Sequence, residues 1–262
     1  MDMTEKDIIN GKLTNEQIQR LEKEKELLKW KDVYNYSKYI NNYNYSSELV
    51  AGYVIINSYC MQNFGYTSPI SFFANAIFSA TLLTLIAISK KIKYYGLTKV
   101  KNAKRFLYFI PLFIIGTVGI WNGIAIKNTA SEIIFHILTM INVGFLEEII
   151  FRGILYKAIE KDNRKLAIII SSITFGLGHI VNLFNGADLI PTLIQICYAI
   201  ALGFLFVTIF NKSKSLIPCI ITHMAINSLS ILGTESTQVF TYLIPAILIL
   251  ISVSYTIFLK KL

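Results

Sequence analysis

The sequence predicts an all-α, polytopic membrane protein with about eight transmembrane helices. The first observation is composition: 54% of the 262 residues are hydrophobic, only 16% are charged, and the mean hydropathy is +0.53. A soluble domain of this size carries fewer apolar and more charged residues. The second is a series of apolar segments long enough to cross a bilayer. The third is the distribution of lysine and arginine, which alternates between successive loops.

The first 46 residues are polar and precede the apolar segments. They contain eight basic and eight acidic side chains, and residues 15–39 have the spacing of apolar side chains that is typical of a helix. We therefore divide the chain into a charged, helical, cytoplasmic extension (residues 1–46) and a membrane-embedded domain (residues 47–262). The extension is either a solvated tail or a helix that contacts the membrane surface or a partner.

Eight apolar segments follow. The first is the weakest, because it is short and carries Asn57 and Gln62. The others approach the length of about 20 residues that a helix needs to cross the hydrocarbon core. The predicted transmembrane helices cover residues 49–64, 69–89, 106–126, 130–156, 166–184, 189–210, 216–232 and 239–259.

Basic residues lie in every second loop. The basic loops cover residues 90–105, 157–165, 212–214 and 260–261, with seven, four, two and two basic side chains. The alternate loops contain one lysine in total and cover residues 65–68, 127–128, 185–188 and 233–238. The positive-inside rule therefore predicts a multi-pass protein of the cell membrane with both termini in the cytoplasm.

The net charge of +9 does not indicate a nucleic-acid-binding protein. The charge lies in the predicted cytoplasmic loops, and no basic face, zinc knuckle or RNA-binding motif accompanies it. Cys60, Cys197 and Cys219 are widely spaced in apolar runs and form no CxxC pair. We interpret them as small buried hydrophobic residues.

Two adjacent glutamates and an arginine lie inside the fourth apolar segment. Ionisable side chains at such depth are costly and rarely incidental. Glu148 and Arg152 are four residues apart, so they share a helix face and are placed to form an ion pair. Glu147 is rotated by about 100° from Glu148 and is left without that partner. We expect a structural role for Glu148 and Arg152 and a chemical one for Glu147, although both glutamates also suit interhelical contacts.

His179, His223 and Asn227 complete a candidate catalytic group. Counted at 1.5 Å per residue from the predicted cytoplasmic helix ends, His223, Glu147 and His179 lie about 10, 15 and 20 Å deep. Asn227 is one turn from His223 on the same helix face. These side chains are therefore expected in neighbouring layers of the membrane, facing its cytoplasmic half.

These residue types suit the hydrolysis of a peptide bond. A carboxylate in a low-dielectric site can act as general base on a water molecule, and a side-chain amide can donate to the developing oxyanion. Imidazoles can position that water or hold a metal, and two histidines with one glutamate are a zinc ligand set. The ligands would come from three helices, because the HExxH spacing of soluble zinc proteases is absent.

Each member of the group also has a structural interpretation. Imidazole and amide side chains commonly form hydrogen bonds between membrane helices. His136 lies about 16 Å further from the cytoplasm than Glu147, and we interpret it as structural. Phe175 suits a packing wall. Gly176 and Gly178 would let another helix approach closely beside the first histidine of the group.

The three motifs, in this order along the chain, resemble the CAAX-protease and bacteriocin-processing family of intramembrane endopeptidases, also called the Abi family. The family pattern is EExxxR, then FxxxH, then HxxxN. This chain has Glu147-Glu148…Arg152, Phe175…His179 and His223…Asn227. The resemblance covers residues 106–232.

The resemblance implies an eight-helix membrane fold with a cavity that opens toward the cytoplasm. It implies that Glu147 activates water, that His179 and His223 assist or bind a metal, and that Asn227 has the oxyanion role. The side chains that would support the site are Glu148, Arg152 and Phe175. Zinc-dependent and metal-free glutamate mechanisms both fit these residues. Eukaryotic members of the family trim three residues after a prenylated cysteine, and bacterial members are linked to bacteriocin maturation, self-immunity and peptide signalling.

We therefore expect a membrane endopeptidase that cuts a membrane-associated peptide or protein. Its expected partners are that substrate and the lipid bilayer, with no nucleic acid. One alternative is a non-catalytic scaffold or immunity protein of the same fold. Another is a transporter in which Glu147 and the histidines relay protons, although the internal repeat common in transporters is absent from the sequence.

Overall fold

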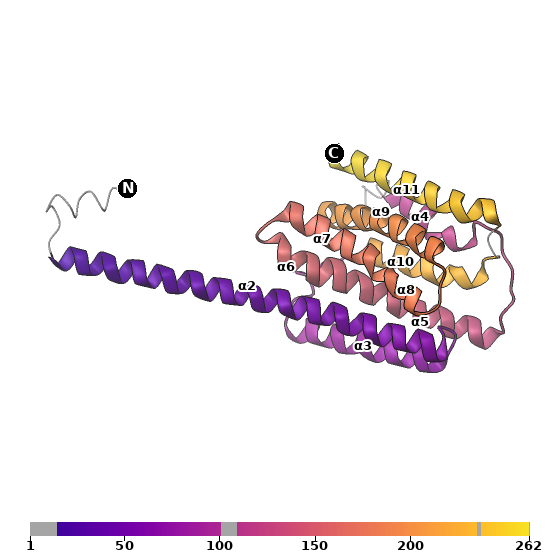
Figure 1. Cartoon of the computed structure of the whole chain (residues 1–262), viewed down its shortest axis with the longest axis horizontal. Helices are drawn as coiled ribbons and strands as arrows, with labels where there is room; N and C mark the ends of the chain where they lie inside the picture. The colour runs from indigo at the N-terminus through magenta and orange to yellow at the C-terminus, as the bar shows by residue number, and fades with distance from the viewer. Residues whose placement is uncertain (1–14, 101–108, 235–236, 262) are drawn as a thin grey trace. The chain divides into compact units, whose positions relative to one another are not determined.

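A computed structural model describes residues 15–100, 109–234 and 237–261. Within these ranges every regular element is a helix, and one isolated antiparallel bridge joins Ile124 and Gly233. The all-α prediction is confirmed (Figure 1). The chain divides into two compact units, Met1–Tyr45 and Ser46–Leu262. In the first unit, the described residues are helical and belong to α2 (Asn15–Phe64).

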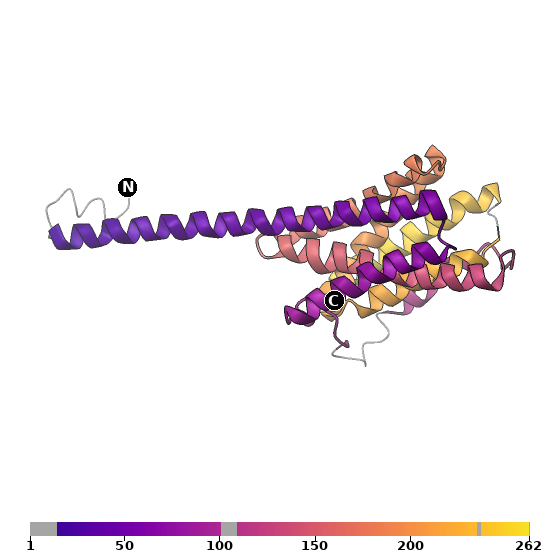
Figure 2. The same cartoon turned by 90° about the horizontal axis from the view of Figure 1, so that it is seen from below.

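The second unit contains the end of α2 and all later helices, seen from two sides in Figure 1 and Figure 2. The α-helices are α3 (Pro69–Ile88), α4 (Ile110–Gly116), α5 (Ala130–Glu148), α6 (Tyr156–Glu160), α7 (Arg164–Leu177), α8 (Val181–Phe184), α9 (Leu189–Ser213), α10 (Ile217–Leu229) and α11 (Gln238–Lys261). Short 3₁₀ turns follow three of them: η2 (Val118–Ile120) after α4, η4 (Gly178–Ile180) after α7 and η5 (Ser230–Leu232) after α10. A π-helix, η3 (Ile149–Leu155), lies between α5 and α6.

Five helical segments are long and apolar enough to cross a membrane. They are Pro69–Ile88, Ala130–Glu160, Arg164–Phe184, Leu189–Ser213 and Gln238–Lys261. Each overlaps a predicted transmembrane helix, so the chain is a multi-pass membrane protein. Two further apolar helices, Ile110–Ile120 and Ile217–Leu232, are shorter.

Residues 106–108 of the predicted transmembrane helix over 106–126 lie outside the described residues, and residues 121–126 are not helical, so the predicted extent is wrong at its C-terminal end. The described helical part, Ile110–Ile120, is only about 16 Å long, about half the thickness of the hydrocarbon core. After it the chain is held by hydrogen bonds to the last residue of η5 and to Thr234 beyond it. The amide of Ala125 donates to the carbonyl of Leu232 at 2.9 Å, and the amide of Thr234 donates to the carbonyl of Gly123 at 3.2 Å. These contacts satisfy backbone groups that a longer helix would have satisfied internally.

Capping residues fix the beginnings of two helices that carry site residues. Thr129 and Glu132 form a reciprocal capping box at the start of α5, which satisfies free amide groups of the first turn. Asn163 accepts a hydrogen bond from the amide of Leu166 at 3.0 Å and caps α7. The register of the two helices with respect to their ends is therefore set by local sequence.

Two glycines allow the helices that carry the motifs to approach closely. A Cβ atom at Gly144 would lie 2.8 Å from the backbone nitrogen of Met224, so α5 and α10 meet at backbone distance. A Cβ atom at Gly176 would lie 2.9 Å from the carbonyl oxygen of Ile196, so α7 and α9 do the same. The expected close approach is present at Gly176 but not at Gly178, where the nearest atom would be 4.0 Å away. Each close contact lies one turn before a motif residue, and this positions the site.

Candidate active site

The glutamates and the arginine lie where α5 changes into a π-helix. The π-helical residues Ile149–Leu155 are all buried, and they include Arg152. Single π-helical turns inside α-helices often occur at functional sites. Despite this change, Nη1 of Arg152 donates to Oε1 of Glu148 at 2.8 Å, which is the contact expected from their spacing.

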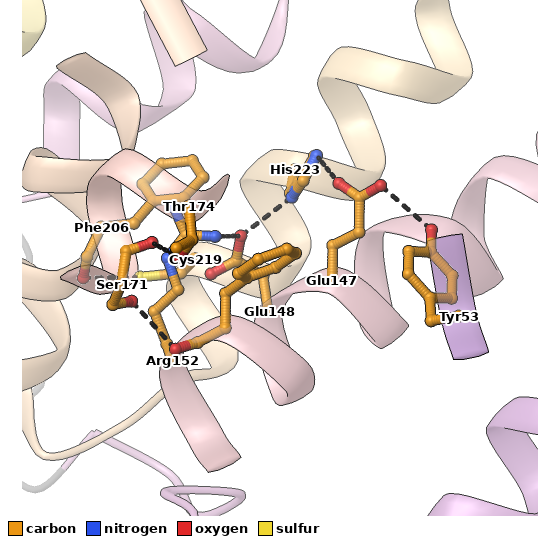
Figure 3. A network of polar contacts seen from close by, with 10 residues as sticks. Tyr53, Glu147, Glu148, Arg152, Ser171, Thr174, Phe206, Cys219 and His223 are labelled. Carbon is orange, nitrogen blue, oxygen red and sulfur yellow. Dashed lines mark hydrogen bonds and ion pairs between the residues drawn. The ribbon is translucent and has the colours of Figure 1, made fainter. Parts of the chain in front are cut away.

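Five side chains from three helices form one continuous polar network (Figure 3). The hydroxyl of Tyr53 on α2 donates to Oε1 of Glu147 at 3.0 Å. Oε2 of Glu147 lies 3.3 Å from Nε2 of His223. Nδ1 of His223 lies 2.9 Å from Oε1 of Glu148, which also accepts from Arg152. The two glutamates are therefore linked through His223, and the expectation that Glu147 stands apart from the Glu148–Arg152 pair is incomplete.

The inner end of this network is fully enclosed. The side chains of Glu148 and Arg152 have no exposed surface. The guanidinium carbon of Arg152 lies 3.9 Å from the ring centre of Phe175 and 5.5 Å from that of Phe206. The aromatic faces stabilise the cation where water does not reach. Within the described residues, Oε2 of Glu148 and two nitrogens of Arg152 have no hydrogen-bond partner, so the pair depends strongly on its few contacts.

Donor and acceptor chemistry limits where the protons of the network lie. Arg152 only donates, so Oε1 of Glu148 accepts from it, and a hydrogen on Nδ1 of His223 would point to the same oxygen. Oε2 of Glu147 and Nε2 of His223 are within ion-pair distance at 3.3 Å. Two arrangements suit this contact: an imidazolium beside a carboxylate, or a neutral ring beside a protonated Glu147. In both arrangements the four ionisable side chains sum to zero net charge, which favours their burial.

His179 lies in η4 and is held through a second set of hydrogen bonds. Nδ2 of Asn182 donates to Oε1 of Gln195 at 2.9 Å, and Nε2 of Gln195 lies 3.3 Å from Nδ1 of His179. The first bond fixes the orientation of the Gln195 amide. The amide nitrogen of Gln195 is a donor, so Nδ1 of His179 accepts and the hydrogen of the neutral ring is on Nε2. The ring centre of Phe175 lies 5.7 Å from that of His179 and 5.6 Å from that of His223, so Phe175 separates the two imidazoles.

Glu147, His179 and Asn227 line one cavity of about 700 Å³. The carbonyl of Asn227 accepts a hydrogen bond from Nε2 of His136 at 3.2 Å, which connects α5 to α10. His223 lies behind Glu147 and does not line the cavity, because only about 6% of its side chain is exposed, against 13% for Glu147. Of the expected catalytic residues, Glu147 thus presents the carboxylate to the cavity while His223 supports it.

The cavity extends from Glu147 toward one set of helix ends. Its wall includes Tyr66 in the loop between α2 and α3 and Asn185–Ala187 in the loop between α8 and α9. Burial, and then the negative charge of Glu147, raise the pKa of Tyr66 to about 12, so its phenol stays neutral. These loops belong to the set that is poor in basic residues. The positive-inside rule predicts that these loops lie outside the cytoplasm, whereas the family resemblance implies a cavity that opens toward the cytoplasm. These two expectations do not agree for this cavity.

The donor types of the site suit zinc, but their arrangement does not bring three of them together. Among the described residues, no group of three His, Cys, Asp or Glu side chains is placed to hold a metal ion. Nδ1 of His223 is engaged by Glu148, and Nδ1 of His179 is engaged by Gln195. Glu147 and Nε2 of His223 are an adjacent pair of suitable donors on the cavity side of this network. We therefore derive no chemical step through a metal.

Tyr53 and Gln195 were not identified from the sequence. Tyr53 lies in the weakest apolar segment, outside the region that resembles the family, and Gln195 belongs to none of the three motifs. A tyrosine or glutamine in an apolar segment is a weak signal by itself, because either residue commonly forms a hydrogen bond between helices.

Comparison with protein families agrees with the motif pattern. Residues 129–229 match the family model described as type II CAAX prenyl endopeptidase Rce1-like. This part of the chain contains all three motifs, and the resemblance to the CAAX protease family is confirmed. Neither the search of curated proteins nor the search of solved structures found a match.

Proposed function

We propose that this chain, whose residues 129–229 form an Rce1-like domain of the CAAX protease family, is an intramembrane endopeptidase in which Glu147 activates the attacking water. The substrate would be a membrane-associated peptide or protein. The observation that carries the proposal is that Glu147 faces the cavity while both of its oxygens are held, one by Tyr53 and the other by His223.

The first step uses the arrangement in which Glu147 is a carboxylate and His223 an imidazolium. A water molecule in the cavity gives a proton to Glu147 while its oxygen attacks the carbonyl carbon of the peptide bond. Tyr53 and His223 hold the carboxylate in place, and Glu148 fixes the orientation of the His223 ring. Catalytic triads have a similar arrangement, in which a third group orients the side chain that acts in catalysis.

The negative oxygen that forms on the substrate needs hydrogen-bond donors. The side-chain amide of Asn227 and the Nε2 hydrogen of His179 belong to residues that line the same cavity as Glu147. Preorganised donors of this kind stabilise a developing oxyanion more effectively in a low-dielectric site than in water. When the carbon–nitrogen bond breaks, the leaving amine takes the proton that Glu147 accepted from water, and the other product is a carboxylic acid.

The proposal is tested by comparing peptide termini in membranes of cells that express the wild type, Glu147→Gln or Asp162→Asn. Asp162 is exposed in the loop between α6 and α7, so its variant is a control for removing a carboxylate. We expect new peptide termini with the wild type and the control, and none with Glu147→Gln at equal protein amount. The same termini in all three samples would disprove the role of Glu147. Full biological complementation by Glu147→Gln would instead favour a non-catalytic scaffold or immunity protein.

A further inference from the structure

We propose that Ser171 is a positioning residue of the active site, whose hydroxyl holds the π-helical turn η3 and, through it, the buried ion pair behind His223. This inference rests on the proposed function, because it concerns how the carboxylate of Glu147 is kept in place. Ser171 lies on α7 and belongs to none of the three motifs.

Two donors meet at one backbone carbonyl of η3. The amide of Tyr156 donates to the carbonyl of Phe151, five residues earlier, which is the hydrogen-bond pattern of a π-helix. The hydroxyl of Ser171 donates to the same oxygen at 2.9 Å. An α-helical pattern would instead join this carbonyl to the amide of Leu155. The bond from α7 therefore fixes the carbonyl of this rare kind of turn from outside the helix.

The same face of α7 also holds the ring of Phe151 and the neighbouring guanidinium. Ser171 and Phe175 are one turn apart on this helix. The ring of Phe175 meets that of Phe151 edge to face, with 5.4 Å between the ring centres and 74° between the planes. Its centre also lies 3.9 Å from the guanidinium carbon of Arg152, the next residue along the chain. A movement of the Phe151 backbone would therefore displace Arg152 from this ring.

The position of Arg152 affects the proposed catalytic carboxylate through two contacts. Oε1 of Glu148 accepts from Nη1 of Arg152 at 2.8 Å and lies 2.9 Å from Nδ1 of His223. Nε2 of the same ring lies 3.3 Å from Glu147. Figure 3 shows Ser171 together with these side chains. If the guanidinium shifts, Glu148 loses its place, and the His223 ring loses the contact that orients it.

The next residue, Ser172, provides a matched control. Both serines are fully buried, with 0% of their surface exposed. Ser172 packs against α9, because a Cβ atom at Gly203 would lie 3.0 Å from its Cα atom. Within the described residues the hydroxyl of Ser172 has no hydrogen-bond partner. Its removal leaves no group unsatisfied, whereas removal of the Ser171 hydroxyl takes a donor from a buried carbonyl.

NMR of the histidine rings tests the positioning without a substrate. The chain contains three histidines, so ¹⁵N-labelled histidine in the purified full chain reports on these rings alone, and the variants His136→Gln and His179→Gln assign them. The samples to compare are wild type, Ser171→Ala, Ser172→Ala and Ser171→Cys, whose thiol is a weaker donor. If Ser171→Ala does not fold, Ser171→Cys is compared with Ser172→Cys.

We expect the ¹⁵N resonances of His223 to shift in Ser171→Ala, to shift less in Ser171→Cys, and to keep their wild-type positions in both Ser172 variants. The resonances of His136 should stay in place throughout. Wild-type positions for His223 in the Ser171 variants, or equal shifts in the variants of the two serines, would overturn the inference.

Cleavage kinetics then test the consequence for the reaction. The substrate is a synthetic peptide that spans a cut found in the membrane comparison described above. Loss of one neutral hydrogen bond should lower kcat of Ser171→Ala by about 2–10-fold with KM unchanged, while Ser172→Ala should keep the wild-type kcat. An unchanged kcat in Ser171→Ala, or a raised KM alone, would overturn the inference. If the His223 resonances shift as expected but wild type cleaves nothing, the positioning by Ser171 stands and the proposed function fails.

Discussion

Loss of the buried arginine is the perturbation whose effect the structure defines most closely. Arg152→Ala would leave Glu148 with no exposed surface and without the guanidinium that donates to it at 2.8 Å. Removing one partner of a buried ion pair costs about 3–5 kcal/mol. We expect a value near the lower end, because Nδ1 of His223 remains 2.9 Å from the same carboxylate oxygen. Such a loss is a large part of a typical stability of about 5–15 kcal/mol.

The assay is thermal unfolding of the detergent-solubilised full chain, read as the monodisperse fraction that survives heating. Arg164→Ala is a matched control, because Arg164 also pairs with a glutamate four residues away, but at 3.5 Å and with 64% of its side chain exposed. An exposed pair contributes at most about 1 kcal/mol, so this control should unfold almost as the wild type does. Equal unfolding temperatures for Arg152→Ala and Arg164→Ala would refute the reasoning.

A double substitution separates stability from activity. Glu148→Gln with Arg152→Met removes both buried charges and keeps similar side-chain volumes, so it should recover most of the lost stability. Cleavage should stay low, because His223 would lose the carboxylate that orients its ring. Recovery of cleavage together with stability would show that Glu148 has a structural role alone.

Three further predictions concern the proposed reaction. Tyr53→Phe removes a hydrogen bond to the carboxylate of Glu147, worth about 1.5–3 kcal/mol, and should slow cleavage by about 10–150-fold with a normal yield of folded protein; a rate within twofold of wild type would rule out this role. Gln195→Glu should change the pH dependence of cleavage, because a carboxylate accepts from Nδ1 of His179 where the amide donates; superimposable pH profiles would argue against the tautomer assigned to His179. Dialysis against a chelator should leave cleavage unchanged, because the described residues contain no group of three metal-binding side chains; activity that is lost and then restored by zinc would contradict this.

The parts of the fold that follow strong periodic signals were predictable. Five long apolar segments became helices close to their expected positions, because a long apolar run has no other stable form in a bilayer. The pairing of Glu148 with Arg152 was predictable because it depends on spacing within one helix. The end of the helix predicted over residues 106–126 was not predictable, because apolar composition does not show that Gly123 and Ala125 form backbone hydrogen bonds with Thr234 and Leu232.

The candidate site was predictable as a set of residues but not as a network. The motifs identified Glu147, His179 and His223, and hydropathy gave their approximate depths. Which nitrogen of His223 meets which glutamate depends on how closely α5 and α10 pack at Gly144, and helix spacing alone does not define this. The sequence also did not predict toward which helix ends the cavity extends, because the depth of a residue along its helix does not show where side chains leave an open space.

The central claim is that the cavity-facing carboxylate of Glu147 performs the chemistry. The most direct test is the initial rate of peptide cleavage by purified, reconstituted Glu147→Gln, measured beside its unfolding temperature. We predict a rate at the level of protein-free vesicles and an unfolding temperature close to that of the wild type. Cleavage within tenfold of the wild-type rate would contradict the account.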